Sequence, residues 1–148
     1  MIDVELLKQL REETQASIAD CRIALEEAQG DYKKAIEFLK KRGAEIAEKK
    51  KERETSQGLV DSYVHAGKIG VVLTLLCETD FVARTAEFKN LSHEIAMHIA
   101  AMNPKDVDIL LKQEYVRDPK MTVQDLIKQS IGKLGENIVV REFNRVEL

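Results

Sequence analysis

The sequence predicts an α+β protein in which a small helical module and a charged helical connector precede a three-stranded antiparallel sheet packed with helices. Two observations predict this architecture. Apolar residues recur at helical spacing across residues 3–42, whereas residues 59–77 form two apolar runs around a short turn. We therefore expect three parts, a three-helix module at 1–43, a helical connector at 44–56 and a core domain at 57–148.

The helical module is predicted from apolar stripes and from its stop signals. Gly30 is a typical left-handed helix stop and Asp31 a typical N-cap, so they separate the second helix from the third. Gly43 is expected to interrupt the third helix. The connector after it is charged and shows no apolar stripe. The stripes of the first two helices are Val4, Leu7 and Leu10, and Ile18, Cys21, Leu25 and Ala28.

The core domain begins with a predicted hairpin, its strands at 59–64 and 69–77 and its turn at Gly67. A long helix with Phe88, Leu91, Ile95 and Ile99 on one face follows and ends at Asn103-Pro104. A loop-rich segment with Pro119 is expected next. Thr122 then caps a second helix, with Asp125 in the capping-box position, and Gly135 ends it. Residues 136–146 are expected to form the third strand.

The second strand is apolar on both faces. Residues 71, 73 and 75 are Val, Leu and Leu on one face, and residues 72, 74 and 76 are Val, Thr and Leu on the other. The predicted helices can cover only one face of the sheet. A second copy of the chain is the simplest cover for the other face, so the sequence predicts a homodimer packed through its sheets.

The bulk composition excludes several classes of protein. The 148 residues carry 23 Lys or Arg and 26 Asp or Glu, a formal net charge of −3, which argues against a general nucleic-acid binder. No apolar run approaches the roughly 20 residues of a membrane helix, and the first residues lack the pattern of a signal peptide. We therefore expect a cytoplasmic protein without membrane contact.

No motif in the chain indicates catalysis, a metal or a cofactor. His93 and His98 are five residues apart, an offset of about 140° on a helix, so they do not face one another. Cys21 and Cys77 are expected to be small core residues in a reducing compartment. An enzyme is therefore the least favoured function.

The stretch CETDFVART, residues 77–85, poses a separate question. Asp80 and Phe81 follow the second strand directly, without Gly or Pro to make a tight turn. Phe81 either folds back into the core or points outward as a binding anchor, and the residues alone leave both possibilities open.

Four segments, at 10–43, 65–91, 95–104 and 132–145, resemble bacterial translation elongation factor Ts, most specifically in GKIGV, TDFVA and GENI. The resemblance implies a guanine nucleotide exchange factor that binds elongation factor Tu and promotes GDP release. It also implies that the N-terminal module is similar to ubiquitin-associated domains. Two alternatives are a passive elongation factor Tu-binding module or chaperone, and a ribosome-associated RNA binder that uses the basic cluster at 49–53.

The resemblance also implies which residues contact the partner. They are Arg11, Ile18 and Ala19 in the module, His65 and Gly67 in the hairpin turn, and Thr79, Asp80, Phe81 and Val82 in the TDFV loop. The TDFV loop is expected to wedge beside the partner's nucleotide and magnesium site. Many relatives carry Gly and two Met where this chain has Gln15, Ile18 and Ala19. Longer members duplicate the core subdomain, whereas this chain has one, in agreement with a homodimer.

Overall fold

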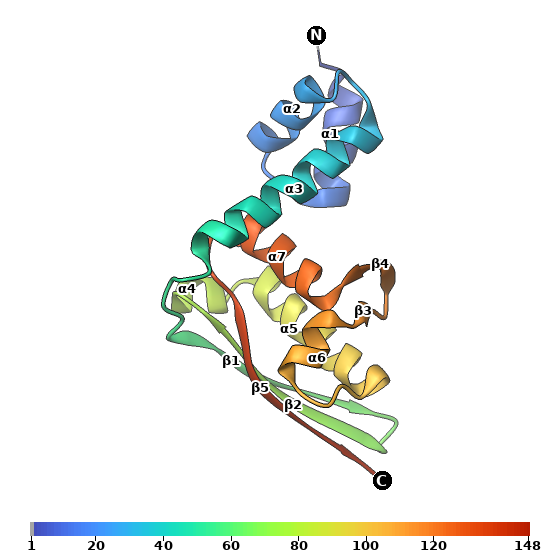
Figure 1. Ribbon diagram of the computed structural model, residues 1–148, viewed down its shortest axis with the longest axis vertical. Helices are drawn as coiled ribbons and strands as arrows, with labels where there is room; N and C mark the ends of the chain where they lie inside the picture. Colours follow the sequence, from blue (N-terminus) through green and yellow to red (C-terminus); the bar gives the residue numbers. More distant parts are fainter. Residues whose placement is uncertain (1) are drawn as a thin grey trace.

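The computed structural model describes residues 2–148 and confirms the α+β class (Figure 1). The helices are α1 (Val4–Thr14), α2 (Ile18–Glu27), α3 (Tyr32–Lys50), α4 (Asp80–Ala83), α5 (Ala86–Met102), α6 (Val107–Lys112) and α7 (Val123–Leu134). The strands are β1 (Gln57–His65), β2 (Ile69–Cys77), β3 (Glu114–Tyr115), β4 (Asp118–Thr122) and β5 (Val139–Glu147). None of these helices is both long enough and apolar enough to cross a membrane.

The molecule is elongated and has two separate hydrophobic clusters. The smaller cluster joins α1, α2 and the first half of α3 around Leu10, Cys21 and Leu25. The larger cluster lies between the sheet and helices α4, α5, α6 and α7, and Phe88 and Leu73 are among its fully buried members. Figure 1 shows the two termini at opposite ends of the molecule, with α3 running from one cluster to the other.

Helix α3 corrects two expectations from the sequence. It continues through Gly43 to Lys50, so this glycine does not interrupt the helix. Instead α3 crosses α7 here, because a Cβ placed on Gly132 would lie 3.0 Å from the Cα of Gly43. The connector also has an inner face, since Ala47 is buried and Ile46 packs against the larger cluster. Gly43 therefore serves a close approach of two helices.

The three-stranded sheet is antiparallel, as the sequence predicts. Its strand order is β1-β2-β5. Helix α5 packs on β1 and β2, and α6 packs on β5. Val71, Leu73 and Leu75 of β2 face these helices and are buried. On the opposite face, Val60, Val72 and Val146 are 69%, 48% and 70% exposed. One face of the sheet is thus covered within the chain and the other is not.

The segment expected to be rich in loops contains helix α6 and a small β3–β4 hairpin. Contacts with Glu94 and His98 hold this hairpin on α5, and they include the ion pair of Arg117 with Glu94 at 2.8 Å. The Tyr115 hydroxyl donates to Glu94 at 2.6 Å, and the Val116 N–H donates to Nδ1 of His98 at 3.2 Å. Elements of six residues or fewer show too little periodicity for sequence patterns to identify.

Candidate functional site

Residues 80–83, which include Asp80, Phe81 and Val82 of the TDFV segment, form the short helix α4, where the sequence suggested a loop. Thr79 is its N-cap, and the Thr79 hydroxyl accepts a hydrogen bond from the Val82 N–H at 3.3 Å. Val82 and Ala83 face the larger hydrophobic cluster and are buried. Phe81 is offset by about 100° from Val82, and its side chain is 73% exposed. Phe81 therefore points outward, which answers the question left open by the sequence.

A carboxylate from a distant part of the chain fixes the start of α4. Glu136 follows α7 and precedes β5. Its Oε1 accepts hydrogen bonds from the Glu78 N–H at 3.1 Å and the Thr79 N–H at 3.0 Å. Its Oε2 accepts from the Thr79 hydroxyl at 2.7 Å. Hydrogen bonds to a carboxylate are stronger than those between neutral groups, so Glu136 holds α4 firmly.

A second set of contacts is made by the carboxylate of Glu78, which lies just before α4. Oε2 of Glu78 accepts a hydrogen bond from the Asn137 N–H at 2.6 Å, and Oε1 of Glu78 pairs with Arg53 at 3.3 Å. The Asn137 amide donates to the backbone carbonyls of Lys51, at 3.4 Å, and Arg53, at 3.0 Å. These bonds join the start of α4 to the chain just after α3.

Helix α4 and the residues next to it in the chain include an exposed ion pair and a buried thiol. Asp80 and Arg84 lie 3.5 Å apart and are both exposed, so their attraction is largely screened by water. Cys77 is fully buried and donates to the Thr79 carbonyl at 3.1 Å. Burial raises the pKa of the Cys77 thiol. This cysteine is therefore a protonated core residue at neutral pH.

The structure places the other residues implied by the resemblance in two further regions. Arg11, Ile18 and Ala19 are exposed on α1 and α2 of the N-terminal module. His65 and Gly67 are exposed at the β1–β2 turn, where Gly67 has φ +67°. Strand β2 separates this turn from α4 by about 26 Å at about 3.3 Å per residue. The nine residues thus lie in three separate regions of the molecule.

Sequence reasoning missed the residues that support α4. The sequence alone does not indicate a role for Glu78, Glu136, Asn137 or Arg53, although the GENI motif of the resemblance contains two of them. The one available signal was that Glu136 follows the helix-ending Gly135, whose φ is +75°. That signal locates a chain reversal but does not indicate that its carboxylate reaches a segment 57 residues earlier.

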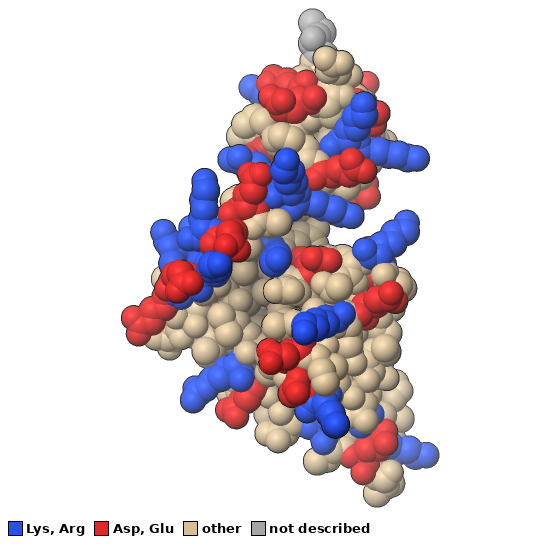
Figure 2. Space-filling view, in the orientation of Figure 1, with Lys and Arg blue, Asp and Glu red and all other residues tan. Residues whose placement is uncertain are grey.

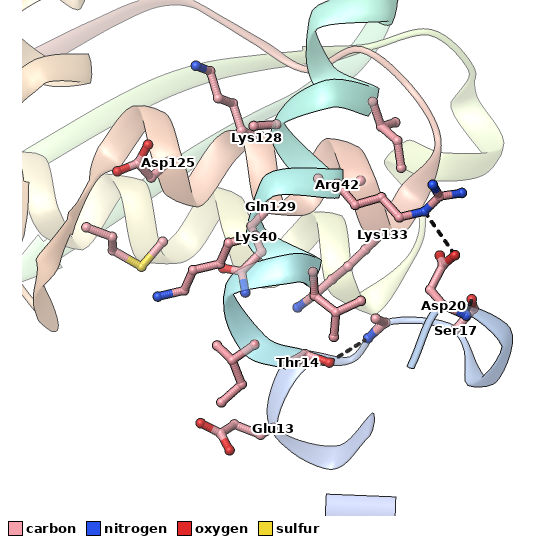
Figure 3. A pocket seen from close by; sticks show the side chains of 18 of the residues that line it. Glu13, Thr14, Ser17, Asp20, Lys40, Arg42, Asp125, Lys128, Gln129 and Lys133 are labelled. Atoms are coloured by element: carbon pink, nitrogen blue, oxygen red, sulfur yellow. Dashed lines mark hydrogen bonds and ion pairs between the residues drawn. The ribbon is translucent and has the colours of Figure 1, made fainter. Parts of the chain in front are cut away.

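A hollow of about 600 Å³ lies between the N-terminal module and α7. Figure 3 shows side chains from α3, α7 and the α1–α2 segment around it, including the ion pair of Arg42 with Asp20 at 3.1 Å. Lys133 also lines it, and partial burial lowers the pKa of this lysine. Figure 2 shows basic and acidic side chains interspersed on this face, most densely over α3 and the module. Within residues 2–148, no cluster of His, Cys, Asp or Glu could hold a metal ion.

Comparisons with known proteins identify the family. A family model described as elongation factor TS matches residues 78–148, which include α4 and Glu136. "Elongation factor Ts" of Thermoanaerobacter sp. (strain X514) is 42% identical, over 99% of this chain and 95% of the relative. The protein of the same name from Fervidobacterium nodosum is 42% identical, over 99% and 98%. That from Rippkaea orientalis is 40% identical, over 99% and 78%.

The first of these alignments spans 193 positions, whereas this chain has 148 residues. The relative therefore carries at least 45 residues without a counterpart here. The similarity nevertheless extends over the helical module, the sheet and α4, since it covers 99% of the chain. This chain belongs to the elongation factor Ts family of translation elongation factors.

Proposed function

We propose that this chain is the guanine nucleotide exchange factor of elongation factor Tu and that Phe81 is the side chain that promotes GDP release. Family membership supports the partner and the reaction. The observation that carries the role of Phe81 is its 73% exposure on a helix whose neighbouring residues Val82 and Ala83 are buried. An exposed aromatic ring on an anchored helix is suited to insert into a partner.

In this mechanism, α4 enters the partner beside its nucleotide and magnesium site. Burying the Phe81 ring there contributes about 1.5–3 kcal/mol. Each tenfold weakening of GDP binding requires about 1.4 kcal/mol of differential binding, so one ring supplies one or two such steps. GDP and magnesium are ligands of the partner. The coupling is reciprocal. Bound GDP lowers the affinity of the partner for the exchange factor by the same ratio as the exchange factor lowers its affinity for GDP.

The two other exposed regions are proposed to dock the partner. Arg11, Ile18 and Ala19 on the module hold it without having to distinguish its nucleotide states. His65 and Gly67 contact it at the other end of β2. Although the resemblance implies a partner contact for Val82, we propose that its buried side chain anchors α4 and that Phe81 is the inserted residue. A partner that contacts all three regions lies along the length of the molecule. We propose that the two proteins meet in the cytoplasm.

We also propose a homodimer that covers the outer face of the sheet. Val60, Val72 and Val146 are exposed on the three adjacent strands of that face. Pairing it with a second copy removes these side chains from water and supplies the second core subdomain. Light scattering after size exclusion should give twice the chain mass, and Val72→Lys should shift it toward one chain mass. A monomer at every concentration would contradict the dimer.

The exchange proposal is tested by stopped-flow release of a fluorescent GDP from elongation factor Tu. The wild-type chain should accelerate release. Phe81→Ala should reduce that acceleration by about 10- to 100-fold, because it removes about 1.5–3 kcal/mol of transition-state binding. Met102→Ala is the matched control, since it removes another large exposed apolar side chain, 44% exposed on α5, and should leave release unchanged.

Three other outcomes are informative. If the wild-type chain binds elongation factor Tu without changing the release rate, it is a passive binding module. If Phe81→Ala and Met102→Ala slow release equally, the ring has no special role. If association weakens steeply with salt and requires RNA, the basic cluster at 49–53 becomes the functional site.

A further inference from the structure

Within the proposed exchange function, we propose that Glu136 is a positioning residue that acts through Phe81. It does not touch the partner in this proposal. It fixes the first turn of α4, and thereby determines where the Phe81 ring lies when the partner arrives. The inference rests on the proposed function, and its test is arranged so that either can fail alone.

Helix α4 cannot hold this position by itself. It has four residues, from Asp80 to Ala83, which form about one helical turn. The first turn of a helix is the unfavourable part of helix formation, so an isolated turn has little stability of its own. Its supports are the buried side chains of Val82 and Ala83, and the hydrogen bonds at its N-terminus. Burial resists withdrawal of α4, but directional bonds are needed to fix its orientation.

Glu136 supplies those directional bonds. Its two carboxylate oxygens accept from three donors, the N–H groups of Glu78 and Thr79 and the Thr79 hydroxyl, at 2.7–3.1 Å. The Thr79 hydroxyl in turn accepts from the Val82 N–H. The bonds therefore run without a break from Glu136 to the residue after Phe81. Loss of the Glu136 carboxylate leaves the Thr79 hydroxyl free to rotate away from its capping position.

The same junction also ties α4 to α3. The Asn137 side chain donates to the carbonyls of Lys51 and Arg53, and Arg53 pairs with Glu78. Because α3 continues into the N-terminal module, this junction gives the module and Phe81 a common support. Glu136 is therefore placed to preserve the spacing between a docking surface and the inserted ring.

A purely structural role for Glu136 makes a different prediction. If Glu136 only stabilises the fold, its loss should act independently of Phe81, and the effects of two substitutions should multiply. If Glu136 acts through Phe81, its loss should have no further effect once the ring is absent. A double-mutant cycle on the rate of GDP release separates the two roles.

The cycle comprises wild type, Glu136→Ala, Phe81→Ala and the double variant, measured by fluorescent GDP release from elongation factor Tu. We expect Glu136→Ala to slow release by about tenfold, equivalent to about 1.4 kcal/mol. In the Phe81→Ala background, the same substitution should change the rate by less than about twofold, within the usual error of additive behaviour. Glu45→Ala, which removes an exposed carboxylate on α3, is the control and should match wild type.

Glu136→Gln tests the geometry of the bonds. The glutamine carbonyl can accept from both backbone N–H groups, and its NH₂ can donate to the Thr79 hydroxyl oxygen. It should therefore restore most of the exchange rate lost in Glu136→Ala. Hydrogen exchange of residues 79–84 should become faster in Glu136→Ala and return toward the wild-type rate in Glu136→Gln.

Thr79→Val keeps the proposal testable if Glu136→Ala does not fold. It retains the shape of the side chain and the Thr79 N–H, but loses the hydroxyl that joins Glu136 to Val82. It should slow release in the same direction and also have no added effect without Phe81. A folded Glu136→Ala or Thr79→Val variant that releases GDP at the wild-type rate would overturn the inference. The inference would also be overturned if the effects of Glu136→Ala and Phe81→Ala on the release rate multiplied in the double variant.

The two proposals fail in different ways. If the wild-type chain does not accelerate release, or if Phe81→Ala has no effect, the exchange function as proposed is wrong. If Phe81→Ala slows release while Glu136→Ala does not, the exchange function stands and the positioning role of Glu136 is wrong.

Discussion

Phe81 and Phe88 are seven residues apart, and each lies near the start of a helix that is capped by a threonine. The Thr79 hydroxyl caps α4 through the Val82 N–H at 3.3 Å, and the Thr85 hydroxyl caps α5 through the Phe88 N–H at 3.2 Å. Yet Phe81 is 73% exposed and Phe88 is 0% exposed. The local sequence signals are similar and the outcomes are opposite.

The two phenylalanines differ by one residue in their position relative to the capping threonine. In both helices the third residue after the capping threonine faces the core, Val82 in α4 and Phe88 in α5. Phe81 is the second residue after its cap, so it is turned by about 100° from that direction. A one-residue shift thus converts a core phenylalanine into a surface anchor. Neighbouring residues of β2 show the same contrast, since Leu73 is buried and Val72 is exposed.

The largest expected effect tests the two phenylalanines directly. Phe88→Ala should lower the free energy of unfolding by about 3–5 kcal/mol, because it leaves a cavity in the core. Phe81→Ala should change it by no more than about 0.5 kcal/mol, because the ring contacts mainly water. Urea unfolding followed by circular dichroism measures both. Similar losses in the two variants would show that Phe81 packs against its own chain.

The two faces of β2 provide the next comparison. Leu73 is fully buried against the helices, and Leu73→Ala should cost about 2–5 kcal/mol of unfolding free energy. Val72 is its neighbour on the other face and is 48% exposed. Val72→Ala should cost less than about 1 kcal/mol in the single chain. A loss for Val72→Ala that grows with protein concentration would instead measure the proposed dimer.

The crossing of α3 over α7 is a close contact without large side chains. Gly132→Ala should lower the free energy of unfolding by about 1–3 kcal/mol, since its Cβ would press on the backbone of Gly43, which cannot rotate away. Helix propensity alone would make the same change stabilising by up to about 1 kcal/mol. Thermal unfolding gives the sign. Ser130→Ala, two residues earlier on α7, is the control and should stay near wild type.

The smallest effect concerns a buried histidine. Burial lowers the pKa of His98, and its Nδ1 accepts the Val116 N–H, so the folded state holds the ring neutral. The unfolded chain takes up a proton near pH 6.5. The contribution of the neutral His98 ring to the free energy of unfolding is therefore fully present above that pH. It falls on acidification by at most about 1.4 kcal/mol per pH unit. Urea unfolding at pH 7.5 and pH 5.5 measures the loss of unfolding free energy on acidification. This loss should be smaller for His98→Gln than for the wild type. An unchanged difference would exclude His98 as the cause.

Long elements with strong local signals were predictable from the sequence. The β1–β2 hairpin, the helix from Phe88 to Ile99 and the capping box of Thr122 with Asp125 are all present as expected. Each depends on residues close together in the chain. The local tendency of glycine predicts a helix stop at Gly43, whereas in the structure Gly43 packs against Gly132, 89 residues later in the chain. Helix α6 and the β3–β4 hairpin were too short to leave a pattern.

By itself, the sequence determined the α+β class, the apolar character of both faces of β2, and the presence of an aromatic residue beside an acid where that strand ends. Only the tertiary structure decided that Phe81 faces water and that Glu136 and Asn137 secure the helix beneath it. The physical reason is distance along the chain. Periodicity and caps act within a few residues, but the direction of a side chain at the end of a strand depends on contacts from segments that folding brings together.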